Sequence, residues 1–260
     1  MCGIAGIIPL SKDVTPEMIL EVSKHLLLEN MTRGRDASGF ASWNTVTNKI
    51  LICKQAEEAK TFITNLTLDH VRGPSMIHCR AKTRGDPSDF QNNHPMFGEK
   101  FCIVHNGMVH TMKNLEGYTY KGICDTEVLL SYIEKFGVRG AMPQIDGSAA
   151  VAIMSPSDKK FYLYRHTSPI AMTYFPGKAF VFSSLEYPLK KVASILKSEK
   201  MWGMFPMQTM ADFEEGQLFT IDLVTNNVTV EIIDVSPKVV GTCPPAIVET
   251  AATKLQSPPC

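Results

Sequence analysis

The sequence predicts one large domain that combines helices and strands. Its 260 residues, 44% of them hydrophobic, suffice to bury a sizeable core. Short apolar runs separated by turn residues alternate with segments whose apolar residues recur at helical spacing. No linker-like stretch interrupts about the first 230 residues. We therefore expect a single domain over residues 1–234, followed by a tail over residues 235–260.

The first two elements are a strand and a helix. Gly3–Leu10 is a nearly continuous apolar run, which is typical of a buried strand. Thr15 then offers a capping hydroxyl and Pro16 occupies the first helical position, so we expect a helix that continues to about Asn30. Its apolar side chains recur at core spacing, and we assign this helix no chemistry.

The later elements follow the same two periodicities. Helices are expected over residues 56–68, from Cys124 onward, and over 185–196. Strands are expected over residues 40–43, 49–54, 101–104, 148–154, 160–165, 170–175, 179–183 and 227–233. Beyond Asp234 the chain has five prolines and no periodic apolar face, so the tail is expected to be flexible.

Composition excludes several kinds of partner. Lys and Arg together number 26, as do Asp and Glu, so the formal net charge is zero and neither nucleic acid nor a membrane surface is expected as partner. No apolar run approaches the roughly 20 residues that span a bilayer, and the apolar opening is too short for a secretory signal. We therefore expect a cytoplasmic location, where thiols stay reduced.

The cysteines favour neither disulfides nor a metal site. Seven cysteines, an odd number with no Cys-x-x-Cys spacing, indicate neither a disulfide framework nor a zinc ribbon. His78, Cys79, Cys102 and His105 could gather around a metal, but each lies in an apolar run where a buried free thiol is ordinary. We expect no metal and no cofactor.

Cys2 is the first candidate for chemistry. Removal of Met1 would place a thiol and a free α-amine on one residue. Because an α-amine has a pKa of about 7.7–8.0, part of it is unprotonated near neutral pH and can serve as the base for the thiol. Alternatively, Cys2 is a small hydrophobic residue at the start of a buried strand.

Four further segments carry polar residues that suit a binding site. Arg33-Gly34-Arg35-Asp36 is either a tight turn or part of a site. Arg80 can bind a carboxylate through two parallel hydrogen bonds. Asn106-Gly107 is either an ordinary Asn-Gly turn or a pair of donors for an oxyanion. Asp125 or Thr126 can cap the following helix.

Together these segments resemble the class II glutamine amidotransferases. The matching motifs are Cys-Gly-Ile-x-Gly at Cys2, Arg-Gly-x-Asp-x-x-Gly at Arg33, His-x-Arg-x-x-Thr-x-Gly at His78, His-Asn-Gly at His105, and an aspartate at Asp125. The resemblance covers residues 1–234. It implies an α+β fold of the N-terminal nucleophile hydrolase type, which is a four-layer α/β/β/α sandwich of two antiparallel sheets.

The resemblance also implies roles for individual residues. Cys2 would be the nucleophile, and the Asn106 side chain with the Gly107 N–H would form the oxyanion hole. The residues that would form the glutamine pocket are Arg33, Gly34, Arg80, Thr83, His94 and Asp125. Arg80 would hold the α-carboxylate and Asp125 the α-ammonium. The chain departs from the family at Ala81, Lys82 and Arg84, which affects the pocket lid and the acceptor.

The expected function is hydrolysis of the L-glutamine side-chain amide to glutamate and ammonia. Since no synthase domain is recognisable in the 260 residues, we expect the ammonia to pass to an acceptor on a separate synthase chain. Two alternatives stay open. One is a stand-alone hydrolase of another amide, and the other is a non-catalytic subunit that senses glutamine.

Overall fold

A computed structural model describes residues 1–110, 112–198, 208–210 and 213–234. Within these residues the chain forms two antiparallel sheets and four α-helices. The expected tail over residues 235–260 lies outside the described residues. None of the helices in the described ranges is long and apolar enough to cross a bilayer.

The first sheet has seven strands in the order β11-β9-β10-β1-β4-β2-β3. Their bounds are β1 Gly3–Pro9, β2 Ala37–Trp43, β3 Ile50–Gln55, β4 Ser75–Arg80, β9 Ala171–Phe175, β10 Ala179–Ser183 and β11 Gln208–Met210. The N-terminal strand lies in the middle, with Gly3 opposite Cys79 of β4 and Ala5 opposite Ser183 of β10. Both long edges of β1 are therefore hydrogen-bonded.

The second sheet has six strands in the order β13-β12-β8-β7-β6-β5. Their bounds are β5 Met96–Phe97, β6 Cys102–Val109, β7 Gly147–Ser155, β8 Lys160–His166, β12 Gln217–Asp222 and β13 Val228–Ile232. The four strands expected between residues 148 and 183 thus divide between the two sheets, because β9 and β10 pair beside β1.

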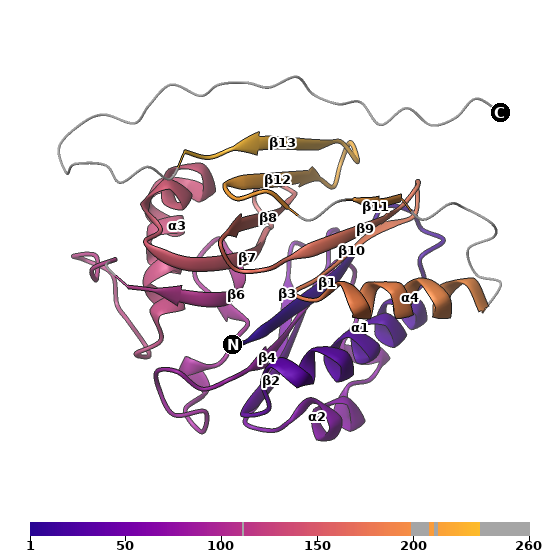
Figure 1. Cartoon of the computed structure of the whole chain (residues 1–260), viewed down its shortest axis with the longest axis horizontal. Coiled ribbons are helices and arrows are strands. Elements are labelled where there is room, and N and C mark those ends of the chain that lie inside the picture. Colours follow the sequence, from indigo (N-terminus) through magenta and orange to yellow (C-terminus); the bar gives the residue numbers. More distant parts are fainter. Residues whose placement is uncertain (111, 199–207, 211–212, 235–260) are drawn as a thin grey trace.

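The helices cover the outer faces of the sheets. Their bounds are α1 Pro16–Asn30, α2 Ala59–Asn65, α3 Asp125–Ala141 and α4 Glu186–Ser198, with 3-10 turns at Met31–Arg33, Leu68–His70, Phe90–Asn92 and Met142–Gln144. Helices α1, α2 and α4 contact the seven-stranded sheet, and α3 contacts the six-stranded sheet (Figure 1). The predicted order of helix, sheet, sheet and helix is confirmed.

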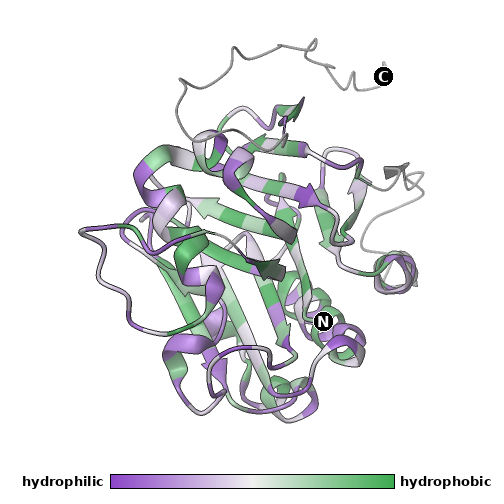
Figure 2. Cartoon of the chain, turned by 60° about the vertical axis from the view of Figure 1, so that its left-hand side comes forward, coloured by the Kyte–Doolittle hydropathy of each residue, from purple (hydrophilic) through white to green (hydrophobic). Residues whose placement is uncertain are grey.

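Three hydrophobic layers hold this sandwich together. Since side chains alternate along a strand, Ala5 and Ile7 of β1 pack under α1, whereas Ile4 and Ile8 pack against the second sheet. The third layer lies between α3 and the outer face of the six-stranded sheet. Figure 2 shows the hydrophobic colour concentrated on the strands, while the connecting loops are mostly hydrophilic.

Helix α1 begins as predicted. The Thr15 hydroxyl accepts a hydrogen bond from the Met18 N–H at 3.4 Å, and Pro16 occupies the first turn. The predicted capping of α3 is wrong. Cys124 is its N-cap and makes no side-chain cap hydrogen bond, while Asp125 is already helical. The Asp125 carboxylate instead accepts a hydrogen bond from the Val109 N–H.

Candidate active site

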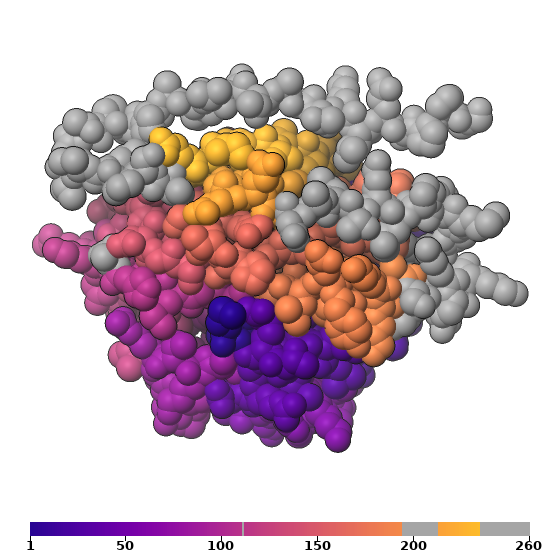
Figure 3. Space-filling view, viewed as in Figure 1, coloured from indigo at the N-terminus to yellow at the C-terminus, as the bar shows by residue number. Residues whose placement is uncertain are grey.

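Cys2 immediately precedes β1 and is half-buried. The Cys2 Sγ donates to the Ala81 carbonyl at 3.5 Å, and the Cys2 carbonyl accepts from the Arg33 Nε at 2.7 Å. Met1 is 76% exposed, and Figure 3 shows the first residues at the surface of the molecule.

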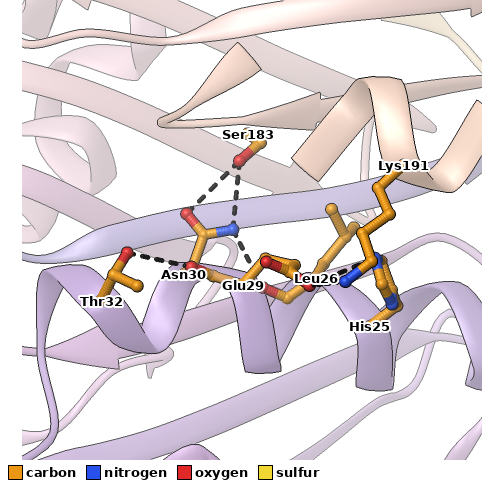
Figure 4. Close-up of polar contacts among 7 residues, drawn as sticks. All are labelled: His25, Leu26, Glu29, Asn30, Thr32, Ser183 and Lys191. Carbon is orange, nitrogen blue, oxygen red and sulfur yellow. Dashed lines mark hydrogen bonds and ion pairs between the residues drawn. The ribbon is translucent and has the colours of Figure 1, made fainter. Parts of the chain in front are cut away.

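Buried polar contacts hold the strand that follows Cys2. The Ile4 N–H donates to the Ser184 hydroxyl at 3.0 Å. Gly3 lies so close to Asn30 that a Cβ at residue 3 would be 2.9 Å from the Asn30 Cβ. The Asn30 amide in turn donates to the Leu26 carbonyl at 2.9 Å and to the Ser183 hydroxyl at 3.1 Å (Figure 4). The end of α1 and the end of β10 therefore both support the start of β1.

The Arg33-Gly34-Arg35-Asp36 segment connects Cys2 to the end of β4. A Cβ at Gly34 would be 2.2 Å from the Arg80 carbonyl carbon, so only glycine allows this approach. The Asp36 N–H donates to the Arg80 carbonyl at 2.9 Å, and the Asp36 carboxylate accepts from the Lys82 N–H at 2.6 Å. The segment is more than a local turn, because it bonds to two other predicted site segments.

Arg80 is 3% exposed and lies at the end of β4. Its Nη1 donates to the Asn93 side-chain carbonyl at 2.7 Å. Its Nη2 donates to the Arg84 carbonyl and, at 2.9 Å, to the Gly85 carbonyl. Three of the five N–H donors of a guanidinium are thus bonded to the surrounding loops. Arg80 shapes the loop over Ala81–Gly85.

Asn106 and Gly107 lie inside β6 and not in a turn. They lie opposite Ala150 and Ala149 of β7, and β6 continues to Val109. Cys102 and Val104 face the first sheet, so alternation turns Asn106 toward it as well. Strand β6 contacts both β1 and β4 across the space between the sheets. Gly107 has a φ of 148°, which favours glycine.

The Asn106 side chain is fully buried. Neither its amide nitrogen nor its amide oxygen has a hydrogen-bond partner among the described residues. Buried amides are normally paired, because leaving one unpaired costs about 1–3 kcal/mol. An unpaired donor on the face toward β1 is the arrangement that an oxyanion hole requires.

Asp125 joins the start of α3 to the end of β6. Its Oδ2 accepts from the Val109 N–H at 2.8 Å, and it is 8% exposed. Asp125 lines a cavity of about 220 Å³ with Arg84, His110 and Tyr120. The complete lining is Arg84, Val109, His110, Met112, Asn114, Tyr120, Gly122, Ile123, Cys124, Asp125 and Val128.

His94 belongs to a buried cluster of imidazoles. Its ring lies 4.1 Å from that of His78, and its Nε2 lies 3.6 Å from the Cys124 Sγ. The Nδ1 of His105 lies 2.9 Å from the Thr126 hydroxyl. Burial lowers the pKa of His78 to about 3 and also lowers the pKa values of His94 and His105. The three rings are therefore neutral near pH 7.

The charges at the site act on the Cys2 thiol. Burial is the largest effect and raises its pKa. The Ala81 carbonyl contact, the chain N-terminus and Arg80 lower it, and Asp125 raises it. Arg80 and Asp125 are thus both close enough to influence Cys2. Because the thiol is held protonated, a nearby base is needed to form the thiolate.

Of the predicted residues, Arg33 contacts Cys2, Gly34 packs against Arg80, and the charges of Arg80 and Asp125 act on Cys2. Thr83 is the exception, since it is exposed in the loop after β4 and has no side-chain contact in the described part of the chain. Lys54 was not predicted. Its ammonium donates to the Asn93 carbonyl at 2.7 Å and the Pro95 carbonyl at 3.2 Å, and so fixes the segment that carries His94.

Comparison with known proteins agrees with this arrangement. Residues 78–191 match the family described as a glutamine amidotransferase domain. The glutamine–fructose-6-phosphate aminotransferase of Sulfurisphaera tokodaii is 24% identical over 241 residues, which cover 85% of this chain and 40% of that protein. Its counterpart in Francisella tularensis is 32% identical over 192 residues, which cover 66% of this chain and 30% of that protein. The chain spans less than half the length of these relatives.

Two solved structures share the fold. The glutamine phosphoribosylpyrophosphate amidotransferase from B. subtilis has a TM-score of 0.66 at 17% identity and covers 90% of this chain and 50% of that one. An allosteric regulatory enzyme of purine biosynthesis has a TM-score of 0.69 at 18% identity with the same coverage.

The sandwich of two antiparallel sheets, with Cys2 at the start of a central strand, is an N-terminal nucleophile hydrolase fold. Within that fold class, the glutamine amidotransferase domain match and the similar aminotransferases support a class II glutamine amidotransferase.

Proposed function

We propose that the chain hydrolyses the side-chain amide of L-glutamine to glutamate and ammonia, with Cys2 as nucleophile after removal of Met1. The observation that carries the proposal is the buried Asn106 side chain. Strand β6, which carries it, contacts β1, the strand that follows Cys2, and the Asn106 amide has no partner within the described residues.

The reaction has two covalent steps. The free α-amine of Cys2 takes the thiol proton, and the thiolate attacks the amide carbon of glutamine. The Asn106 amide and the Gly107 N–H stabilise the negative oxygen. The protonated amine then gives its proton to the leaving nitrogen, so ammonia departs and a γ-glutamyl thioester forms. Water cleaves the thioester, releases glutamate and restores the thiol.

The binding residues divide into two groups. Asp125 would pair with the α-ammonium of glutamine, as its position in the cavity supports. The loops that carry Arg33, Gly34, Arg80, Thr83 and His94 would form the rest of the pocket. Arg33 donates to the Cys2 carbonyl, and Arg80 donates to the Asn93 side chain. Gly34 packs against the Arg80 backbone, so these loops would provide a rigid pocket wall.

The acceptor of the ammonia is proposed to lie on a synthase. The curated relatives are glutamine–fructose-6-phosphate aminotransferases, and this chain spans only 40% and 30% of the two reported above. We propose that this synthase is a separate chain that consumes the ammonia. Copurification of such an enzyme, together with faster glutamine hydrolysis in its presence, is the expected result.

The catalytic proposal is tested by mass spectrometry of the purified chain, with and without 6-diazo-5-oxo-L-norleucine, a glutamine analogue that alkylates thiols. We expect loss of Met1 and one adduct on Cys2. A Cys2→Ala variant should keep its fold and lose both the adduct and ammonia release. Cys53→Ala is the matched control, because Cys53 is partly buried on β3 outside the site. Glutamine hydrolysis by Cys2→Ala at the wild-type rate would overturn the mechanism.

A further inference from the structure

We propose that a second cavity, beside β3, β5 and α3, binds a small organic anion with a flat apolar body, of the aromatic carboxylate class. The cavity has a volume of about 140 Å³, and its lining includes Lys54, Phe97, Tyr118, Lys121 and Glu127. It shares no lining residue with the cavity that contains Asp125. This inference goes beyond the proposed hydrolysis and does not depend on it.

The positive charge of this cavity is not balanced by an ion pair. Lys54 is half-buried, and burial lowers its pKa. Its ammonium donates to the Asn93 and Pro95 carbonyls, which leaves one of its three N–H donors unused among the described residues. None of the ion pairs between described residues includes Lys54 or Lys121. A partly desolvated cation without an anionic partner favours an anion in the adjoining space.

Glu127 lines the cavity, but its carboxylate is already hydrogen-bonded. Its Oε1 accepts from the Lys121 N–H at 2.7 Å, and its Oε2 accepts from the Gly122 N–H at 2.8 Å. The residue is 6% exposed. Because both oxygens bind backbone N–H groups, Glu127 fixes the chain that presents Lys121 to the cavity.

Phe97 and Tyr118 give the cavity an aromatic surface. Phe97 is 44% exposed, although it is a large apolar side chain. Tyr118 is half-buried, and its ring centroid lies 4.8 Å from that of Tyr120. The buried apolar part of the lining includes Pro95, Met96 and Leu130. Cations beside an exposed aromatic ring favour a ligand that has both a negative charge and a flat apolar body.

NMR titrations of the whole chain with benzoate and with benzamide test this site. The two probes have nearly the same shape, but only benzoate is charged. We expect benzoate to bind about 10- to 100-fold more tightly, because benzamide cannot accept charge-assisted hydrogen bonds through a carboxylate. The amide signals of Phe97 and Lys121 should shift. Those of His110 and Asn114 should not, because these residues line the other cavity.

Three variants separate the charged part of the site from the aromatic part. Lys54→Gln should remove most of the preference for benzoate. Lys121→Gln should also reduce this preference, and it provides the test if Lys54→Gln fails to fold, because Lys121 is exposed and its contact to Glu127 uses only the backbone. Phe97→Ser should weaken the binding of both probes about 2- to 10-fold, because the aromatic contact does not depend on charge.

Two control variants change similar residues outside the cavity. Phe136→Ser removes a phenylalanine that is 45% exposed, and Lys100→Gln removes an exposed lysine. Neither variant should change the affinity for either probe.

Three outcomes would overturn the inference. They are equal affinities for benzoate and benzamide, signal shifts centred on His110 and Asn114, and an unchanged preference for benzoate in Lys121→Gln and in a folded Lys54→Gln. A preference for benzoate that falls in the two lysine variants and stays constant in the two controls supports it. The titrations require no turnover of glutamine, so this result is independent of the hydrolytic function.

Discussion

Gly107 lies against the backbone carbonyl of Ser148 so closely that a Cβ at residue 107 would come within 1.9 Å of that oxygen. Its φ of 148° is also unfavourable for other residues. The strand that carries the proposed oxyanion donors can therefore pair with β7 only if residue 107 is glycine.

Gly107→Ala should destabilise the fold by several kcal/mol, since strain and overpacking each cost roughly 1–3 kcal/mol. Urea unfolding measures this change. Gly177→Ala is the control, because Gly177 has a φ of 66° but nothing within 4 Å of an added Cβ. That variant should lose only about 1–2 kcal/mol. Equal losses of stability in the two variants would show that the close contact with Ser148 does not add to the cost of Gly107→Ala.

Asn106→Ala should lower kcat for glutamine by about 10²–10³-fold while leaving stability nearly unchanged or increased. The loss of rate follows from removing an oxyanion donor, and the unchanged stability follows from removing a buried amide that has no described partner. Steady-state kinetics and urea unfolding of the same preparation measure both effects.

Asn92→Ala is the control for Asn106→Ala, because the buried Asn92 amide is hydrogen-bonded. The Asn92 amide donates to Asp89 at 3.0 Å and accepts from the Ile123 N–H at 3.0 Å, so its removal should cost about 1–3 kcal/mol. If Asn106→Ala is destabilised as strongly as Asn92→Ala, the Asn106 amide has a structural partner and the oxyanion interpretation weakens.

Asp125→Asn should keep the fold and weaken glutamine binding at least about 10-fold. The amide oxygen can still accept from the Val109 N–H, but the charge for the α-ammonium is gone. Asp125→Ala should in addition lose about 1–3 kcal/mol of stability, because the Val109 N–H is left unpaired. Calorimetric titration in the Cys2→Ala background and urea unfolding separate the two roles. Unchanged glutamine affinity in Asp125→Asn would exclude a contact with the ammonium.

Stability should fall as the pH is lowered from about 6.5. His78, His94 and His105 have pKa values below 6.5 in the folded protein, that of His78 at about 3, and burial is the main cause in each case. As the pH falls, these histidines therefore bind protons in the unfolded chain before they do so in the folded chain. Each ring contributes up to about 1.4 kcal/mol per pH unit between its unfolded and folded pKa.

Urea unfolding at pH 7.5, 6.0 and 5.0 checks this dependence before most carboxylates titrate. Imidazole NMR signals of His78 should stay in the neutral form throughout that range. A stability that stays constant from pH 7.5 to 5.0 would mean that the rings take up protons in the folded state.

The sequence predicted the strands well, because period-two alternation and apolar runs report on local structure. The sandwich of two sheets was predicted from the family resemblance. The Asn106-Gly107 pair shows a case in which the local sequence does not decide the structure. Asn-Gly is a strong turn signal, and the alternative of a turn after Val104 was left open. Pairing with β7 overrides that preference and carries β6 on to Val109.

Contacts between loops that lie far apart along the chain could not be predicted from the sequence either. The family resemblance implied that Arg80 binds the substrate carboxylate. It did not indicate that the Arg80 guanidinium also donates to the Arg84 and Gly85 carbonyls and to the Asn93 side chain. No pattern in the chain pairs residues 80 and 93. The same holds for Lys54, whose acceptors lie about 40 residues away along the chain.

The central place of β1 has a further consequence. Chain ends usually fray, but β1 is hydrogen-bonded to β10 on one side and to β4 on the other. The amides of Ile4–Ile8 should consequently exchange with deuterium as slowly as any in the molecule. Folding would then immobilise the proposed nucleophile, Cys2, before substrate binds, so little of its ordering entropy would be lost on binding.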